Sequence, residues 1–510
     1  MQTQAPAGGA QSPQREIANA YALVERRALG EAEAACRRAL AATNNGSPQA
    51  WTALGVVLRE QGRAAESKAA YERAITVAPR HVPAHHNLGA LLSQMDRAEE
   101  ALASLDRAAS FGLNAPELHI NRGRALAQLY RFDEAERSYA QAVALESRNV
   151  DAQSMLAQLR YMRGDPAFAR DFMTAVRANP GDLALQFNYT ELLRRCGDLT
   201  GAEALLRMVL KNSGMAPEVR SALAGLLHET GRLAEAENEA LQAALSRPGN
   251  SKLIETFVQI ELALGKPDAA SPLIRTERQR RPRDPRWVTY EAMAARLSGD
   301  PVYQYLYDYE RLVRVYELQP PAGWSSMAQV NAAVCEALKT RHNLATHPLD
   351  QSLRNGTQTM RNLLAEQDPA IQALIAAFAE PIGDYCAAIG QGPDHPLTAY
   401  NRGGAGLHGC WSVELHRNGF HVNHFHPEGW LSSAYYVSVP AEVSDPQARS
   451  GWLKFGEPRL PVPGLQADHF VQPRAGCLVL FPSYMWHGTN AITGAEPRLT
   501  VAFDAVPRAG

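Results

Sequence analysis

The chain has 510 residues, 45% hydrophobic and 20% charged, so we expect an ordinary globular protein of about two to four domains. Its 51 basic and 53 acidic residues give a formal net charge of −2, which offers no bulk attraction to nucleic acid or anionic lipid. Apolar runs are too short for a membrane span. The six cysteines are scattered without a CxxC pair, a pattern typical of reduced thiols in a cytoplasmic protein.

The first segment, residues 1–15, is polar and rich in Gln, Ala and Gly. It lacks both the basic start and the apolar stretch of a signal peptide. We therefore expect a flexible lead-in before the folded part of the chain.

From residue 16 to residue 285 the sequence repeats itself, with a period of 34 residues in its clearest part. A small residue in the glycine column lets two helices cross closely, and a bulky column fills the space beside the crossing. The pattern predicts about eight helical hairpins. The four columns are Gly55, Gly89 and Gly123; Ser67, Ala101 and Ala135; Tyr71, Leu105 and Tyr139; and Ala74, Ala108 and Ala142.

These columns resemble the tetratricopeptide repeat. The segment 51–79, WTALGVVLREQGRAAESKAAYERAITVAP, carries nearly every element of that repeat, from Trp51 to Pro79. The resemblance implies an all-α superhelix, and arrays of this kind mostly bind other proteins.

Asparagines recur at one position of the repeat, as Asn87, Asn121 and Asn188. This position lies on the first helix of each hairpin, which lines the concave face in this repeat class. A carboxamide can both donate to and accept from a peptide unit, so the three side chains would hold an extended chain by its backbone. Such a row resembles the asparagine ladder of repeat-bearing glycosyltransferases. The alternative is that these asparagines are solvated surface.

Beyond the array, residues 286–320 are predicted as a helical linker that includes one helix over 301–318. Amphipathic stretches near 326–340 and 369–389 predict two further helical segments. The polar run 354–359 is too polar for a helix interior and is expected to form a loop over the active site.

After about residue 398 the sequence pattern changes to short strand-like runs that are separated by Gly and Pro. We therefore expect an α+β unit over 321–510, with an antiparallel β structure flanked by helices. The runs are HGCWSVEL, SSAYYVSV, GWLKF, CLVLF and LTVAF.

Histidines are concentrated in this last part, and three of them have the spacing of metal ligands. His424 and His426 would share one face of a strand, about 7 Å apart, close enough to bind one ion. His487 directly follows an apolar strand, and Arg498 comes eleven residues later. Three protein ligands with open metal positions, and an arginine fork for a carboxylate, are what a non-haem iron, 2-oxoglutarate-dependent oxygenase needs.

The same part of the chain resembles the bacterial 2-oxoglutarate–Fe(II) oxygenases that follow tetratricopeptide repeats and are similar to prolyl hydroxylases. The resemblance implies a double-stranded β-helix, or jelly roll, that uses Fe(II), 2-oxoglutarate and O2. The motifs that carry it are HPLDQSLRNGTQT, CWSVEL, GFHVNHFHPEGWLSSAYYV, GWLKFGEP and LVLFPSYMWHGT…RLTVAFD.

One departure from the related hydroxylases concerns the metal ligands. Those enzymes carry H-x-D or H-x-E, whereas His426 stands here where the carboxylate would be. Either His424, His426 and His487 hold the iron, or Glu428 replaces His426. Position in the family also implies that Tyr436 binds 2-oxoglutarate with Arg498. Thr500, two residues past Arg498 on the same strand face, is expected to hydrogen-bond the same carboxylate. Trp411 is expected to line the substrate mouth.

The leading hypothesis is an Fe(II)- and 2-oxoglutarate-dependent hydroxylase whose repeats present a protein or peptide substrate. The alternative is a non-enzymatic repeat scaffold with a degenerate barrel. A repeat-bearing glycosyltransferase or sulfotransferase is excluded, because 321–510 is too short for two Rossmann units and carries no phosphate-binding glycine loop.

Overall fold

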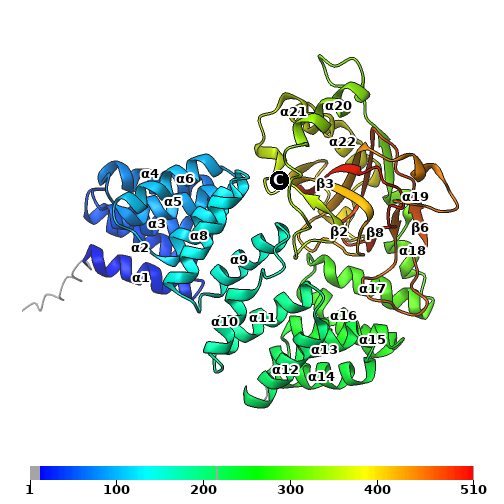
Figure 1. The fold of residues 1–510 in the computed structure, drawn as a ribbon, viewed down its shortest axis with the longest axis horizontal. Helices are drawn as coiled ribbons and strands as arrows, with labels where there is room; N and C mark the ends of the chain where they lie inside the picture. Colours follow the sequence, from blue (N-terminus) through cyan, green and yellow to red (C-terminus); the bar gives the residue numbers. More distant parts are fainter. Residues whose placement is uncertain (1–11, 214–215, 509–510) are drawn as a thin grey trace, which may run out of the picture. The chain divides into compact units, whose positions relative to one another are not determined.

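A computed structural model describes residues 12–213 and 216–508 of the chain (Figure 1). By its internal contacts the chain divides into two compact units, residues 1–156 and 157–510. Most of the predicted lead-in, residues 1–11, lies outside the described residues. The first helix already begins at Pro13, where the Ser12 hydroxyl accepts a hydrogen bond from a main-chain N–H of the first turn.

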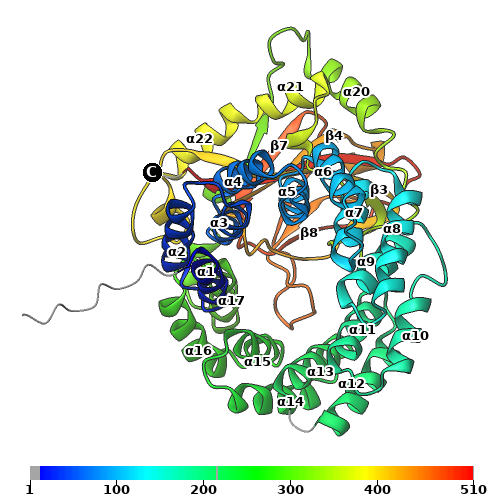
Figure 2. The ribbon, with the colours of Figure 1, turned by 90° about the vertical axis from the view of Figure 1, so that its left-hand side faces the viewer.

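Sixteen helices follow one another in eight consecutive pairs in the described part of the array, which confirms the predicted all-α superhelix. Figure 2 shows α10 to α16 of the second unit as a curved row, with α9 crossing the boundary between the units. The helices are α1 (Pro13–Glu25), α2 (Leu29–Ala42), α3 (Pro48–Glu60), α4 (Ala64–Val77), α5 (Val82–Gln94), α6 (Ala98–Ser110), α7 (Pro116–Gln128), α8 (Phe132–Leu145), α9 (Val150–Met162), α10 (Arg170–Ala178), α11 (Leu183–Arg195), α12 (Leu199–Ser213), α13 (Pro217–Glu229), α14 (Leu233–Ser246), α15 (Ser251–Ala263) and α16 (Pro267–Arg280).

The close crossing within a pair depends on the glycine column. A Cβ added to Gly55 in α3 would lie 2.4 Å from the buried ring of Tyr71 in α4. At Gly123 the same clash occurs with Tyr139, again from the second helix of the pair. The repeated columns of the sequence are therefore the two sides of one helix–helix contact.

The segment predicted as one helix over 301–318 is broken in the structure. After α17 (Pro285–Ser298) it forms α18 (Val302–Leu306), α19 (Tyr309–Leu312) and then strand β1 (Arg314–Glu317). The prediction was wrong for β1, because these residues alternate in burial and pair with a strand far along the chain. The domain boundaries that the sequence places at residues 285 and 320 stay a prediction. Helix α17 and all the described strands belong to the second unit.

Nine strands form two antiparallel sheets among the described residues, ordered β1-β7-β4-β9-β3-β2 and β6-β5-β8. The five strand-like runs of the sequence fall on β3, β4, β5, β7 and β9. The run 354–359 is no loop, since most of it forms the edge strand β2, whose backbone bonds to β3. The strands after β1 are β2 (Leu353–Gln358), β3 (Ala405–His421), β4 (Leu431–Ser438), β5 (Leu453–Phe455), β6 (His469–Val471), β7 (Cys477–Pro482), β8 (His487–Thr489) and β9 (Arg498–Pro507).

The larger sheet has a helix-covered face and a face that meets the smaller sheet. Helices α20 (Met327–Leu338), α21 (Pro369–Ala377) and α22 (Ala379–Ile389) confirm the two predicted helical stretches. The Phe378 ring between α21 and α22 packs on Phe503 of β9. On the other face, Phe455 of β5 packs edge-on against Phe481 of β7, with ring centres 5.0 Å apart.

None of the helices in the described ranges is both long and apolar enough to cross a membrane.

Alanine at Gly55 should destabilise the first unit by about 1–3 kcal/mol, because its methyl group has no room against Tyr71. Gly30→Ala is the matched control, since a Cβ at this helical glycine meets nothing within 4 Å. Urea unfolding followed by far-ultraviolet circular dichroism measures both. Equal transitions for Gly55→Ala and Gly30→Ala would contradict the close crossing.

Candidate metal centre

Three imidazoles meet where the two sheets join. His487 begins β8, whereas His424 and His426 lie between β3 and β4. The prediction that these two histidines share one face of a strand was wrong, because β3 ends at His421 and His424 forms an isolated bridge to His487 instead. Reciprocal main-chain hydrogen bonds of 2.8 and 2.9 Å between His424 and His487 tie the two segments together. One ring nitrogen of each of the three histidines lies within 4.8 Å of the others. This spacing suits three ligands of one transition-metal ion.

Hydrogen bonds fix which nitrogen of each ring is free. The Nδ1 atoms of His424 and His487 lie 2.9 Å from the carbonyl oxygens of Val422 and Met485. A carbonyl only accepts, so each Nδ1 carries the proton and donates it. The Nε2 lone pairs therefore remain available, which is the form of histidine that binds metals.

Burial keeps the rings of His424 and His487 neutral. It lowers the pKa of His424 to about 3 and holds the pKa of His487 well below its ordinary value, with the neighbouring histidines acting in the same direction. A neutral imidazole loses no proton when it binds a cation, so the site is prepared for a metal ion.

His426 differs from the other two because its partner is a carboxylate. Its Nδ1 lies 2.6 Å from one oxygen of Asp504 and 2.8 Å from the other. Burial would raise the pKa of Asp504, but His426 and a hydrogen bond from Ser432 outweigh it and keep that pKa below its usual range. The sequence analysis missed Asp504. The feature that could have indicated it is a single acidic residue in the apolar strand RLTVAFDAV, an even number of residues from Arg498 and therefore on the same face of the strand.

Glu428, the alternative ligand, lies apart from this group. The side chain is exposed and does not join the cluster of potential ligand atoms found among the described residues. It lines the same cavity as the histidines, beyond Pro427.

The histidines open into a cavity of about 810 Å³. Alternate residues of β9 face it, namely Arg498, Thr500, Ala502 and Asp504, as the two-residue period of a strand requires. Tyr436 of β4 and Trp411 of β3 also line it, and the Trp411 ring lies 6.2 Å from that of His426. The predicted residues of the second half therefore surround one space.

Two buried donors in this cavity have no hydrogen-bond partner in the described chain. They are Nε of Arg498, a residue only 2% exposed, and the hydroxyl of Tyr436. The Arg498 guanidinium donates to the Gly451 carbonyl and lies 5.7 Å from the Tyr436 ring centre. Thr500 donates to the Val413 carbonyl. Unpartnered donors beside a fixed guanidinium suit a bound carboxylate.

The three asparagines of the repeats lie elsewhere. Each is five residues beyond the start of its helix, with Asn87 on α5, Asn121 on α7 and Asn188 on α11. Asn87 and Asn121 belong to the first unit and Asn188 to the second. The Asn188 amide donates to its own helix at Ala184, and Asn121 contacts His86.

Helix α17 packs against both segments that carry the proposed metal ligands. The Phe425 ring, between the two histidines, packs edge-on against Tyr290 of α17 and against Trp486. Trp486 precedes His487, and its Nε1 lies 3.1 Å from the sulfur of Met293. Thr289 donates to the Tyr484 carbonyl at 2.6 Å. The position of the histidines therefore depends on a helix that continues the repeat array.

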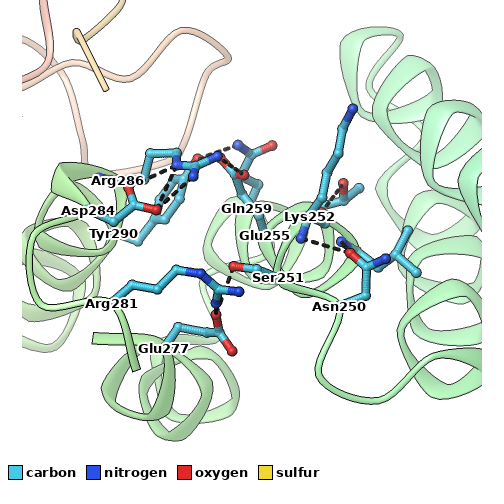
Figure 3. A network of polar contacts seen from close by, with 12 residues as sticks. Asn250, Ser251, Lys252, Glu255, Gln259, Glu277, Arg281, Asp284, Arg286 and Tyr290 are labelled. Carbon is cyan, nitrogen blue, oxygen red and sulfur yellow. Dashed lines mark hydrogen bonds and ion pairs between the residues drawn. The ribbon is translucent and has the colours of Figure 1, made fainter. Parts of the chain in front are cut away.

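A polar network holds α17 in turn (Figure 3). The Tyr290 hydroxyl donates to Glu255 of α15 at 2.7 Å and accepts from Gln259 of the same helix. Arg286 pairs with Asp284 and reaches Glu255. Because Tyr290 is fully buried, these bonds also satisfy its hydroxyl.

Family models match both halves of the chain. Residues 409–504 match a family described as "Putative 2OG-Fe(II) oxygenase", residues 120–183 and 191–251 match one tetratricopeptide-repeat model, and residues 48–81 match another. Parts of the chain thus match tetratricopeptide repeats and a 2OG-Fe(II) oxygenase family, which confirms the resemblance seen in the sequence. The oxygenase family implies Fe(II) and 2-oxoglutarate, and the repeats indicate protein–protein interaction.

Solved repeat proteins are similar to parts of the chain. Yeast Tom70 is 17% identical with a TM-score of 0.45, covering 60% of this chain and 67% of its own. A tetratricopeptide repeat protein from Parabacteroides merdae ATCC 43184 is 20% identical with a TM-score of 0.36, covering 49% of this chain and 99% of its own. No curated protein matches the chain.

Asp504→Asn should lower the affinity for Fe(II) roughly 10- to 100-fold, because it removes the charge behind His426. Glu428→Gln makes the same chemical change on an exposed side chain and should retain the metal. Anaerobic Fe(II) titration of both variants gives the comparison. A larger loss in Glu428→Gln than in Asp504→Asn would make Glu428 the ligand.

Proposed function

We propose that this protein is an Fe(II)- and 2-oxoglutarate-dependent dioxygenase that hydroxylates a protein or peptide substrate. The observation that carries the proposal is the cluster of three histidines with free Nε2 atoms in one cavity with a buried, incompletely bonded arginine. The match of residues 409–504 to an oxygenase family supports the same reaction class.

In this proposal His424, His426 and His487 hold the iron. The donor set fits a divalent iron, since imidazole suits this metal and the hydrogen bonds at Nδ1 leave Nε2 available on all three rings. Asp504 supplies through His426 the negative charge that a ligating carboxylate would supply directly. The exposure of Glu428 supports His426 over Glu428 as the third ligand.

Arg498, Tyr436 and Thr500 are proposed to bind 2-oxoglutarate. The unpartnered Arg498 Nε and Tyr436 hydroxyl are donors that a carboxylate would satisfy, with Thr500 on the same face of β9. When bound, iron and 2-oxoglutarate activate O2 to hydroxylate a C–H bond, and 2-oxoglutarate becomes succinate and CO2.

The chain's own contribution is to fix the ligands and to place apolar side chains beside them. Phe481 packs edge-on against His487 with ring centres 4.6 Å apart, and Leu453 lines the same wall. Apolar walls strengthen the electrostatic interactions of the groups inside them.

A protein substrate is supported by the way in which the repeats reach the cavity. Helix α11 of the array contributes Arg194 and Arg195 to the wall of the cavity that holds the histidines. A surface of an interaction repeat therefore borders the proposed reaction site directly.

The test is anaerobic titration of the full chain with Fe(II) and 2-oxoglutarate. Wild type should develop the weak visible charge-transfer band of the iron–2-oxoglutarate complex. His487→Ala should not, because it removes a proposed ligand. His416→Ala is the control, since His416 is exposed and bonds to Glu414 away from the cluster. No band in wild type at saturating metal would contradict the oxygenase function.

Arg498→Lys should weaken 2-oxoglutarate binding about tenfold or more, because an ammonium cannot reproduce a guanidinium fork. Isothermal titration of 2-oxoglutarate into the metal-loaded variant measures the change. Thermal unfolding of the same variant checks that the buried lysine leaves the fold intact. An unaltered affinity in a folded variant would place the co-substrate elsewhere.

A further inference from the structure

Besides Arg498, arginines from three distant parts of the chain gather in the wall of the metal cavity. They are Arg195 at the end of α11, Arg354 in β2, and Arg459 in the loop after β5. All belong to the second unit. A fourth, Arg194, is neutralised because Glu191 and Glu229 both pair with it.

The other three lack equivalent partners. Among residues 12–213 and 216–508, no carboxylate pairs with Arg195 or Arg354, and Arg354 donates only to main-chain carbonyls. Arg459 reaches Glu229 at 3.9 Å, but that glutamate is held more closely by Arg194. Burial lowers the pKa of Arg354, and the positive charge of Arg459 acts in the same direction.

The cavity also has acidic residues at its edge, which do not cancel this charge. Asp350 and Glu428 are both exposed and pair with no arginine in the described chain. Excess positive charge in the wall of a concave site attracts an anionic ligand and speeds its encounter.

A second cavity of about 540 Å³ adjoins the first. It shares Arg194, Arg195 and Arg459 with the metal cavity. Its floor is formed by the first helices of three successive repeats, α11, α13 and α15, together with α17. The two cavities therefore lie side by side and meet at these three arginines, and we call the two together the groove.

This groove also holds polar groups without a partner. Nε2 of His228 on α13 is buried in its wall and has no hydrogen-bond partner in the described part of the chain. Lys252 of α15 lies farther along, exposed and without a carboxylate at ion-pair distance among the described residues. An extended peptide offers carbonyl groups and side chains to both.

We propose that this groove binds an acidic segment of the protein substrate. Asp or Glu side chains of the segment pair with Arg195, Arg354 and Arg459, while a neighbouring residue reaches the three histidines. The inference rests on the proposed function, because that function makes the end of the groove at the histidines the reaction site. It assigns the substrate contacts to arginines of α11, β2 and the loop after β5.

The experiment measures the binding of peptides to the full chain by fluorescence anisotropy, in the presence of a metal chelator and without 2-oxoglutarate. The probes are labelled peptides of equal length built from Glu-Gly-Ser, Gln-Gly-Ser and Lys-Gly-Ser repeats. The acidic peptide should bind best, and its affinity should fall as salt is raised because exposed ion pairs are screened. Equal binding of the acidic and neutral peptides would overturn the proposal.

Charge-reversal variants test which arginines contact the acidic peptide. Arg195→Glu and Arg459→Glu should each weaken the acidic peptide roughly tenfold. Arg275→Glu is the matched control, because Arg275 is exposed on α16, has no ion pair in the described chain and lines neither cavity. Equal losses in Arg195→Glu and Arg275→Glu would overturn the assignment.

Two competitors test whether the groove prefers an acidic peptide to other anions. Free glutamate that displaces the peptide at equal concentration would assign the groove to a small acid. Tighter binding of single-stranded oligothymidylate would assign it to nucleic acid, and either result overturns the proposal. Because binding is measured without iron, failure here leaves the charge-transfer test of the oxygenase standing, and the reverse also holds.

Discussion

The metal centre depends on the packing of helix α17 against the two segments that carry the histidines. Phe425 and Trp486 lie next to the proposed ligands, and both pack on α17 through Tyr290 and Met293. Burying an aromatic side chain of this size contributes about 1.5–3 kcal/mol, so the contact is strong compared with a single hydrogen bond. Two chain segments far apart in sequence are therefore held in one geometry by one helix.

This packing joins the later repeats to the sheets. Tyr290 is anchored by Glu255 and Gln259 of α15, so the last helices of the array position the helix on which the ligand segments pack. The repeats in this part of the chain thus have two roles. They stabilise the ligand segments, and α11, α13 and α15 line the groove that leads to them; Gln259 and Tyr290 take part in both.

Features with short-range signals could be predicted from the sequence. The glycine and bulky columns predict the helix pairs because each column forms one side of a local crossing, as at Gly55 and Tyr71. His424, His426 and Arg498 could be selected because the spacing of the two histidines and the place of Arg498 at the start of a strand are local, although the two histidines lie outside the strands. Asp504 has a local signal as a lone acid in an apolar strand, but its role could not be predicted, since its partner His426 is 78 residues away. Strand β1 was missed because its pairing with β7 decides its conformation.

The most direct test of the account is extended X-ray absorption fine structure at the iron edge of the anaerobic, Fe(II)-loaded full chain. The spectrum counts the imidazoles bound to the metal through their characteristic multiple scattering. Ligation by His424, His426 and His487 predicts three imidazoles per iron. Two imidazoles with a protein carboxylate, or iron bound by oxygen alone, would contradict it.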